Sequence, residues 1–263
     1  MMNFREQALF ALQQTVIEDK IKAVRAISLD DCVLDPSQLI TNSLPLPGKP
    51  DKPELVNPRT VKFRSVGSEQ GRAALLHAIA HIEFNAINLA LDIIWRFPHM
   101  PEAFYTDWLR VAKEECYHFS LVREHLQNMG YEYGDLVAHS GLWDMCEKTT
   151  QDLLARLALV PRTLEARGLD VNPGMQEKFK QIGDLRAVEI LQIILRDEVG
   201  HVEIGNRWYK YLCAQQNLDP ILCYADLLVR YDGSKPKGPF NVADRMKAGF
   251  TQEEIDWLHS LQA

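Results

Sequence analysis

The sequence lacks the features that mark secreted, disulfide-bonded or membrane proteins. It has five cysteines, an odd number at wide spacings with no C-x-x-C pair: Cys32, Cys116, Cys146, Cys213 and Cys223. This pattern argues against a disulfide framework and a structural zinc knuckle, and it fits reduced thiols in a cytoplasmic protein. No stretch reaches the roughly 18 consecutive apolar residues of a membrane span. The N-terminus carries Arg5 and Glu6 and no long apolar run after them, so we expect no signal peptide.

An excess of basic charge is also missing. The formal net charge is −7, which disfavours a general nucleic-acid-binding protein, although tRNA stays open as a partner. The sequence contains no phosphate-binding loop of the G-x-x-x-x-G-K-[ST] type, no dinucleotide fingerprint and no G-x-S-x-G nucleophile motif. Alternation of β-branched residues over strand lengths is absent as well. With 46% hydrophobic residues in 263, the chain can form a sizeable core, and we expect an all-α fold.

The first 66 residues predict a helix followed by an extended arm. Apolar residues recur at helical spacing over 4–27, which indicates one amphipathic helix. The segment 29–66 contains five prolines between positions 45 and 58, which exclude a regular helix. Leucine, valine and phenylalanine side chains are scattered through this segment. We therefore expect an arm packed on the core, and the alternative is a flexible linker between two domains.

Four longer helices are predicted after the arm, over about 68–97, 101–130, 148–167 and 184–214. Ser68 is a suitable N-cap for the first helix, and the turn from Phe97 to Pro101 separates it from the second. The second helix begins at Pro101, a favoured first position, and Gly130 ends it. The residues 131–147 predict a loop or a short irregular stretch. The two pairs of helices predict a four-helix bundle of two antiparallel hairpins.

The second pair of helices is less regular in sequence. Pro161 is expected to kink the third helix, and a break is expected at 168–173 before a short helix over 173–182. The rest of the chain predicts a helix over about 218–230 and a final helix that Thr251 opens through a capping-box pattern. We expect one structural domain built from an N-terminal helix and arm, a bundle and a C-terminal helical extension, over 1–66, 67–216 and 217–263.

One motif occurs twice on the predicted bundle helices. The residues from Glu115 to His118 read Glu-Cys-Tyr-His, and those from Glu198 to His201 read Glu-Val-Gly-His. Residues i and i+3 share one face of a helix, so each glutamate can point in the same direction as its histidine. Both pairs continue apolar stripes and are expected to face the core. Two such motifs, with one more glutamate from each of two other helices, form the di-metal carboxylate site of ferritin-like bundles.

Two lone glutamates complete this pattern by their spacing. Glu83 lies on an apolar helix face, and Glu115 follows it by 32 residues, with the turn at 97–101 midway. Glu198 follows Glu165 by 33 residues. An antiparallel hairpin folded at its midpoint places two such residues at the same height, although the expected break after Glu165 weakens this argument for the second hairpin. The alternative for Glu83 and Glu165 is an exposed, solvated side chain.

These six residues offer four carboxylates and two imidazoles. Such donors suit iron or manganese better than metals that prefer thiolates, so we expect two iron ions, with manganese or a mixed iron–manganese pair as alternatives. Two divalent ions also balance the charge of four carboxylates. Ligand histidines usually donate their second ring N–H to an outer acceptor. Glu114 and Asp197 directly precede the ligand glutamates and are candidates for this role; the alternative is that both are surface acids.

Three further side chains are candidates for a pocket beside the metals. His77 and His81 are four residues apart on one predicted helix, as in some zinc sites, but no glutamate stands next to the first histidine as in a zinc protease. They would serve in proton transfer or substrate contact, or else they are packed or surface histidines. Tyr117 lies between two predicted ligands and would be redox-active or simply packed.

The motifs together resemble a known family. They are AHIE (80–83), EECYH (114–118), EARGLDV (165–171), RDEVGH (196–201) and the arm PGKPDKPELV (47–56). They are similar to a large, functionally uncharacterised bacterial family in the ferritin-like superfamily and, more distantly, to the di-iron tRNA hydroxylase. The resemblance implies that the metal ligands are Glu83, Glu115, His118, Glu165, Glu198 and His201. Tyr117 and Gly200 stand where many oxygenases of the superfamily carry an arginine, so this chain departs from the classical hydroxylase pattern.

Three functions are compatible with this pattern. The favoured one is a di-iron oxidase or oxygenase that activates O₂ and acts on a small-molecule or nucleoside-type substrate, with an electron-donor protein as a partner. The second is a non-catalytic metal-binding protein, such as a ferroxidase or an iron store. The third is a metal-free helical scaffold whose glutamates form ion pairs, for which Arg162 and Arg196 are the nearby cations. The pattern does not distinguish a monomer from a homodimer.

Overall fold

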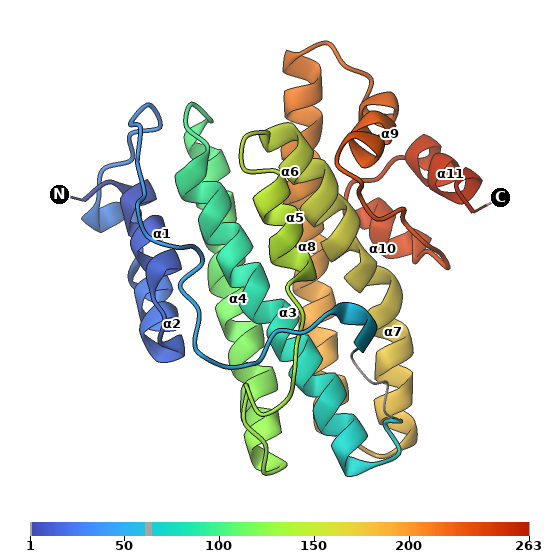
Figure 1. Ribbon diagram of the computed structural model, residues 1–263. Helices are drawn as coiled ribbons and strands as arrows, with labels where there is room; N and C mark the ends of the chain where they lie inside the picture. The colour runs from blue at the N-terminus through green and yellow to red at the C-terminus, as the bar shows by residue number, and fades with distance from the viewer. Residues whose placement is uncertain (1, 61–64, 263) are drawn as a thin grey trace. The chain divides into compact units, whose positions relative to one another are not determined.

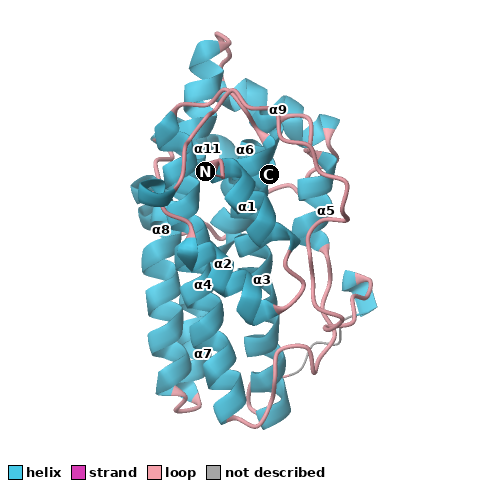
Figure 2. Cartoon of the chain, turned by 90° about the vertical axis from the view of Figure 1, so that its left-hand side faces the viewer, coloured by secondary structure: helices cyan, strands magenta, loops and turns pink. Residues whose placement is uncertain are grey.

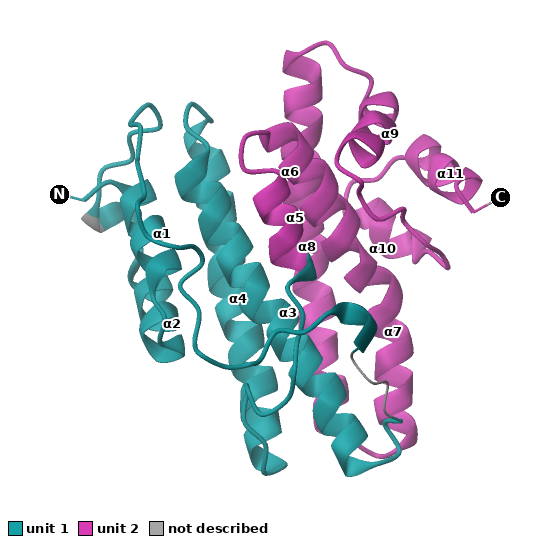
Figure 3. Cartoon of the chain, viewed as in Figure 1, with its two compact units in different colours: residues 1–141 teal, residues 142–263 magenta. Residues whose placement is uncertain are grey.

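The computed structural model describes residues 2–60 and 65–262. Within these residues the chain is helical, with two isolated β-bridges and no strand, which confirms the all-α prediction. The chain divides into two compact units, Met1–Gly141 and Leu142–Ala263 (Figure 3). The boundary falls between the two predicted hairpins, so each unit contains one of them. The three segments predicted from the sequence, with boundaries at 66 and 216, do not coincide with these two units. That the chain forms one structural domain stays a prediction.

The first unit is built on a hairpin of two long helices. Helix α3 (Glu69–Arg96) begins after Ser68, whose side chain accepts a hydrogen bond from the Gly71 N–H. Helix α4 (Glu102–Asn128) follows a short turn and runs antiparallel beside α3 (Figure 1, Figure 2). Gly130, with φ of 81°, supplies the left-handed residue that follows its end. The sequence predicted both helices and their turn, and differed only in placing Pro101 inside α4 rather than at its N-cap.

The predicted single helix over 4–27 is wrong, because this segment forms two helices. Helix α1 (Phe4–Gln13) packs on α3, and α2 (Ile17–Ala26) packs on both α1 and α4. The Lys20 side chain is fully buried, and its Nζ donates hydrogen bonds to the carbonyls of Ala11 (3.2 Å) and Leu12 (2.8 Å). The bend therefore lets the lysine amino group from α2 donate to the carbonyl end of α1, where helix geometry leaves acceptors and partial negative charge.

The described residues of the proline-containing arm form hydrogen bonds with other parts of the first unit. The arm includes two 3₁₀ turns, η1 (Leu29–Asp31) and η2 (Pro58–Thr60). The Gly48 N–H donates to the Leu12 carbonyl (2.9 Å), and the arm exchanges backbone hydrogen bonds with Ala138. The buried Arg5 guanidinium of α1 donates to the carbonyls of Gln38 (2.6 Å) and Trp95 (2.6 Å). These contacts hold the arm to the α1 and α3 helices. The arm residues 61–64 lie outside the described residues.

The second unit also contains a long helical hairpin. Helix α6 (Leu153–Leu159), the π-helix η3 (Val160–Glu165) and α7 (Ala166–Gln181) follow one another without a gap. Helix α8 (Leu185–Gln215) returns beside them after a short turn. The predicted break at 168–173 and the separate helix over 173–182 are therefore wrong.

Tertiary packing explains why α7 continues through Gly168 and Pro173. A proline inside a helix costs about 3 kcal/mol. Here Leu169 and Phe179 are fully buried, and the Asn172 side chain donates a hydrogen bond to the Leu191 carbonyl of α8 (3.0 Å). Burial of two large apolar side chains offsets a cost of this size, so local glycine and proline signals did not end the helix.

Pro161 produces a π-helical turn where the sequence predicted a kink. Its ring lacks an N–H and would clash with the carbonyl four residues earlier in an α-helix. The helix widens instead. The Ala166 N–H donates to the Pro161 carbonyl, and the Thr163 hydroxyl donates to the Ala158 carbonyl (2.7 Å), both five residues back. Gly205 of α8 lies against the Pro161 ring, and a Cβ there would be 2.5 Å from the Cβ of Pro161.

Shorter helices complete the second unit. Helix α9 (Pro220–Arg230) and α11 (Gln252–Ser260) were predicted, including the capping box between Thr251 and Glu254. Helix α5 (Gly141–Lys148), at a predicted loop, and α10 (Val242–Lys247) were missed because short helices carry little periodicity. Helix α9 packs on α6 and α8, and α10 packs on α7 and α8. All five cysteines are free thiols, in agreement with the sequence analysis.

One helix resembles a membrane span by composition. Helix α3 contains an 18-residue window with a mean hydropathy of 1.3, although the sequence analysis found no such run. The sequence contains no uninterrupted apolar run because polar residues interrupt this window. The mean hydropathy of the window nevertheless stays as high as that of a membrane span. Residues filling 78% of the window are buried inside the structure, as in the core helix of a soluble protein. The cytoplasmic location stays a prediction.

Gly205→Ala should destabilise the protein because the new Cβ would overlap the Pro161 ring. Overpacking of this kind costs about 1–3 kcal/mol. Gly174→Ala, inside α7, is the matched control because a Cβ there meets nothing within 4 Å. We expect this control to be neutral or stabilising, since alanine is the better helix former. Denaturant unfolding of both variants measures the difference, and equal free energies of unfolding would contradict close packing of Pro161 on α8.

Lys20→Met should change how stability depends on pH. Burial lowers the pKa of Lys20 from 10.5 to about 7. Between these values the unfolded chain binds more protons than the folded one, so this lysine makes stability rise with pH across that window. The free energy of unfolding of the wild type, minus that of Lys20→Met, should therefore increase from pH 7 to pH 9.

Denaturant unfolding at several pH values measures this difference. Lys22→Met, on the exposed side of the same helix, is the control and should give a smaller slope. A difference for Lys20→Met that stays constant with pH would show that the buried lysine keeps its proton.

Candidate metal centre

Three of the predicted ligands meet in the core of the first unit. Glu83 comes from α3, and Glu115 and His118 come from α4. Their side chains are 4%, 1% and 0% exposed, so none of them reaches bulk water. His118 Nδ1 lies 3.3 Å from Glu83 Oε2 and 3.4 Å from Glu115 Oε2. The three ligand atoms all lie within 4.8 Å of one another, which is a spacing that one metal ion can span.

The hairpin geometry explains why these residues meet. The turn between α3 and α4 lies midway between Glu83 and Glu115, so the antiparallel helices bring both to the same height, as the spacing predicted. His118 is one turn beyond Glu115 on the same face. The same two helices bury apolar residues within about two turns of these ligands in the sequence: Ile79, Ala80, Ile87, Trp108, Ala112, Phe119 and Val122. The exposed alternative for Glu83 is therefore wrong.

The His118 imidazole carries a proton on Nδ1, the atom that faces the two carboxylates. Burial opposes protonation of His118, but hydrogen bonds to Glu115 and Glu83 and their negative charges outweigh it and raise the pKa of His118 to about 11. Without a metal ion the imidazole is thus a cation at neutral pH, with Nδ1 facing two carboxylates. A histidine must be neutral to bind a metal, so metal binding here releases a proton and strengthens as pH rises.

The second unit carries the repeated motif on α8. Glu198 Oε1 lies 3.7 Å from His201 Nδ1, and the His201 side chain is fully buried. Glu165 is the last residue of η3, which packs on α8. The expected break after Glu165 had weakened the prediction that Glu165 and Glu198 lie at the same height of the hairpin. The helix is continuous through 168–173, so this break is absent. Among the described residues, however, Glu165 and His201 do not belong to a group of three ligand atoms as close as those of the first unit.

The predicted outer-shell acids have arginine neighbours on their own helices. Glu114 is partly exposed and lies 4.0 Å from Arg110. Asp197 accepts two hydrogen bonds from the adjacent Arg196, at 2.8 and 3.0 Å. Their role beside the ligand histidines stays a prediction.

The two predicted pocket histidines are tied to a loop of the first unit. His77 is buried, and its Nε2 accepts a hydrogen bond from the Gly134 N–H (2.9 Å). His81 Nδ1 lies 2.9 Å from the Tyr133 hydroxyl, and both imidazoles stack on the Tyr133 ring. Both imidazoles therefore contact this loop, and their role in proton transfer or substrate contact stays a prediction. Tyr117 is 45% exposed and lines a shallow surface groove on α4.

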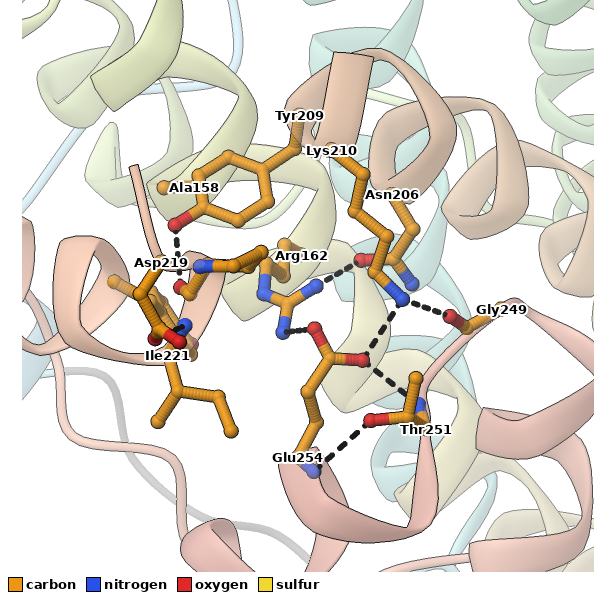
Figure 4. A network of polar contacts seen from close by, with 12 residues as sticks. Ala158, Arg162, Asn206, Tyr209, Lys210, Asp219, Ile221, Gly249, Thr251 and Glu254 are labelled. Atoms are coloured by element: carbon orange, nitrogen blue, oxygen red, sulfur yellow. Dashed lines mark hydrogen bonds and ion pairs between the residues drawn. The ribbon is translucent and has the colours of Figure 1, made fainter. Parts of the chain in front are cut away.

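A buried polar network in the second unit was not predicted from the sequence. Arg162 of η3 lies next to Glu254 of α11 and Asn206 of α8 (Figure 4). A second buried pair joins Asp170 of α7 to Arg245 of α10. The only sequence signal was the capping-box glutamate Glu254, which gives no hint of a partner 92 residues away.

Comparison with known proteins identifies the family. The family described as "Protein of unknown function (DUF455)" matches residues 11–256. The chain is also 54% identical over 220 residues to a Haemophilus influenzae protein named "Uncharacterized protein", and the matched region covers 81% of this chain and 76% of that relative. No solved structure matches the chain. The uncharacterised bacterial family expected from the motifs is thereby confirmed, and the chain belongs to the family described as Protein of unknown function (DUF455).

Proposed function

We propose that this protein is a di-metal carboxylate protein of ferritin-like type. Glu83, Glu115 and His118 would bind one ion, and Glu165, Glu198 and His201 would bind a second. The observation that supports the proposal most strongly is the buried cluster of the first unit, whose three ligand atoms lie within 4.8 Å of one another. The repeat of the same residue types at nearly the same spacing supports a second ion.

The donor set fits iron or manganese. Carboxylate oxygens and imidazole nitrogens suit these ions. The nearest thiol in the sequence, Cys116, is buried, and burial raises its pKa to about 12, so it offers no thiolate that would favour a softer metal. Burial of two carboxylates is costly unless cations or hydrogen-bond donors compensate for it. The protonated His118 imidazole provides part of this compensation in the absence of metal, and a bound divalent ion would provide it once that proton is released.

The metal-free scaffold explains the glutamates less well. Its two candidate cations bind other acids. Arg162 forms its ion pair with Glu254, at 2.6 Å, and Arg196 forms one with Asp197, at 2.8 Å. Each arginine thus pairs with a carboxylate that is not one of the six predicted ligands.

We further propose that the reaction is an oxidation by O₂. A pair of iron ions, when bound, supplies the redox chemistry for O₂ activation. The chain contributes the rest: carboxylates that orient the ions, buried apolar side chains that exclude water, and His118, which gives up its Nδ1 proton on metal binding. The substrate would be a small molecule or a nucleoside-type compound, with an electron-donor protein as a partner. The arm and the C-terminal helices favour an enzyme over an iron store, which usually consists of little more than its bundle.

Metal content tests the proposed centre. Wild-type protein reconstituted with ferrous iron under anaerobic conditions should retain two ions per chain. Glu115→Ala and Glu198→Ala should each lower this content, and the double variant should abolish it. Glu124→Ala on α4 and Glu189→Ala on α8 are matched controls, because both glutamates are exposed. Circular dichroism confirms that each variant is folded. A wild-type content far below two, unchanged in the double variant, would refute the proposal.

Iron retention distinguishes an enzyme from an iron store. After ferrous iron is added in excess in air and the protein is desalted, an enzyme should keep no more than its resident ions. The measurement is the iron-to-protein ratio of the desalted sample. A mineral load far above the resident content would contradict the oxidase or oxygenase function and support storage.

A further inference from the structure

The π-helix that ends at Glu165 is fixed from the side by a buried ion pair. Arg162 lies within this π-helix and is only 1% exposed. Its Nη2 donates to Glu254 Oε1 and its Nη1 to Asn206 Oδ1, both at 2.6 Å (Figure 4). The other carboxylate oxygen of Glu254 accepts from Lys210 Nζ (2.9 Å) and from the Thr251 N–H (2.7 Å). The network thus joins η3 to α8 and to the start of α11.

Aromatic rings enclose the same guanidinium. Its central carbon lies 5.0 Å from the ring centroids of Tyr209 and Tyr224 and 4.6 Å from that of Phe250. A cation in this position gains from ring faces and from its carboxylate partner together. Arg162 therefore has one defined position, and the backbone of η3 is constrained through it.

A second buried pair lies on the other side of Glu165 in the sequence. Arg245 of α10 donates to both carboxylate oxygens of Asp170, at 2.9 and 2.7 Å, and to the Ala166 carbonyl (3.3 Å). The Phe250 ring contacts this guanidinium as well as that of Arg162. The C-terminal segment 245–254 thus binds the helix both before and after Glu165.

The π-helical turn determines the direction in which the side chains after it point. A π-turn contains about one residue more than an α-turn. If η3 relaxed to an α-helix, Glu165 would turn by about 100° around the helix axis relative to α6. Pro161 disfavours that relaxation, but the direction of the Glu165 side chain also depends on what holds the widened turn in place.

We infer that Arg162 and Glu254 are positioning residues for the metal ligand Glu165. The pair holds η3 in its π-helical register and so sets the direction in which Glu165 presents its carboxylate. This inference rests on the proposed di-metal function, since it concerns one of the proposed ligands. It assigns a purpose to the C-terminal extension, which supplies Glu254 from a position 92 residues away in the sequence.

Three variants test the inference. Glu254→Gln keeps the side-chain shape but removes the charge that binds Arg162, and Arg162→Lys removes the paired N–H donors. Arg156→Lys is the control. Arg156 is also 1% exposed and hydrogen-bonded, to Thr149 Oγ1 (2.7 Å) and the Cys146 carbonyl (2.6 Å), but it lies in α6 before the π-helix.

Two measurements are made on each full-length variant. The first is the affinity for ferrous iron under anaerobic conditions, by calorimetry, beside the melting temperature. We expect Glu254→Gln and Arg162→Lys to lower the affinity for one of the two iron ions by about 10- to 100-fold. Arg156→Lys should lower the melting temperature without changing either affinity. The second is hydrogen exchange of the Ala166 amide, which forms the π-helical bond to Pro161, in metal-free protein. It should accelerate in the first two variants only.

The outcomes separate the inference from the proposed function. If the wild type binds no iron, the proposed function fails, and the ligand role of Glu165 fails with it. If the wild type binds two ions but Glu254→Gln leaves both affinities and the Ala166 exchange unchanged, the inference alone is overturned. The same holds if Arg156→Lys weakens iron binding as much as the other two variants, because the effect would then follow general stability.

Discussion

Charges buried inside a protein need a partner at close range, and this requirement shapes much of the present structure. Lys20 and Arg5 are buried without a carboxylate neighbour at hydrogen-bond distance in the described residues, and backbone carbonyls of α1, α3 and the arm accept their hydrogen bonds instead. Arg162 forms an ion pair with Glu254 and contacts three aromatic rings. In each case the buried side chain joins two or more separate segments of the chain, so the need to satisfy buried cationic groups helps to hold the helices together.

The cluster of Glu83, Glu115 and His118 satisfies the same requirement in a different way. Its two carboxylates share one imidazole, whose proton is held tightly. The other buried charges fix the backbone, whereas these side chains come from the middle of two long helices that already pack well. A hairpin of apolar helices does not need three ionisable groups at its centre for stability. Their three ligand atoms are close enough together to hold one metal ion, which supports the proposed centre, and the second unit carries the same residue types.

The sequence predicted the first unit well because its signals are local. Ser68 and Gly130 mark helix ends by their capping chemistry, and a proline-bounded turn sets the hairpin. Once the turn is known, the spacing of Glu83 and Glu115 follows from helix geometry alone. The bend after α1 was missed because the capping cation, Lys20, comes from the following helix and its contact is tertiary.

The second unit was harder to predict for a physical reason. Glycine and proline signals around Pro173 are local, but the packing that overrides them involves α8. The partner of Arg162 is 92 residues away, and no periodicity or motif links such positions. Long-range pairing of buried charges leaves little trace in a single sequence, even where it holds the segment that carries a predicted ligand.

The widened turn at Pro161 has a consequence for relatives of this chain. A π-turn acts as a one-residue insertion that the helix absorbs without a loop. The apolar repeat of α6 therefore does not continue in phase into α7, and a stripe extrapolated across Glu165 would assign the wrong face to Leu169 and Phe179. An α-helical relative that lacks the turn would need one residue fewer between these helices. Loss of Pro161 and replacement of Gly205 should then occur together, since each residue is accommodated by the other.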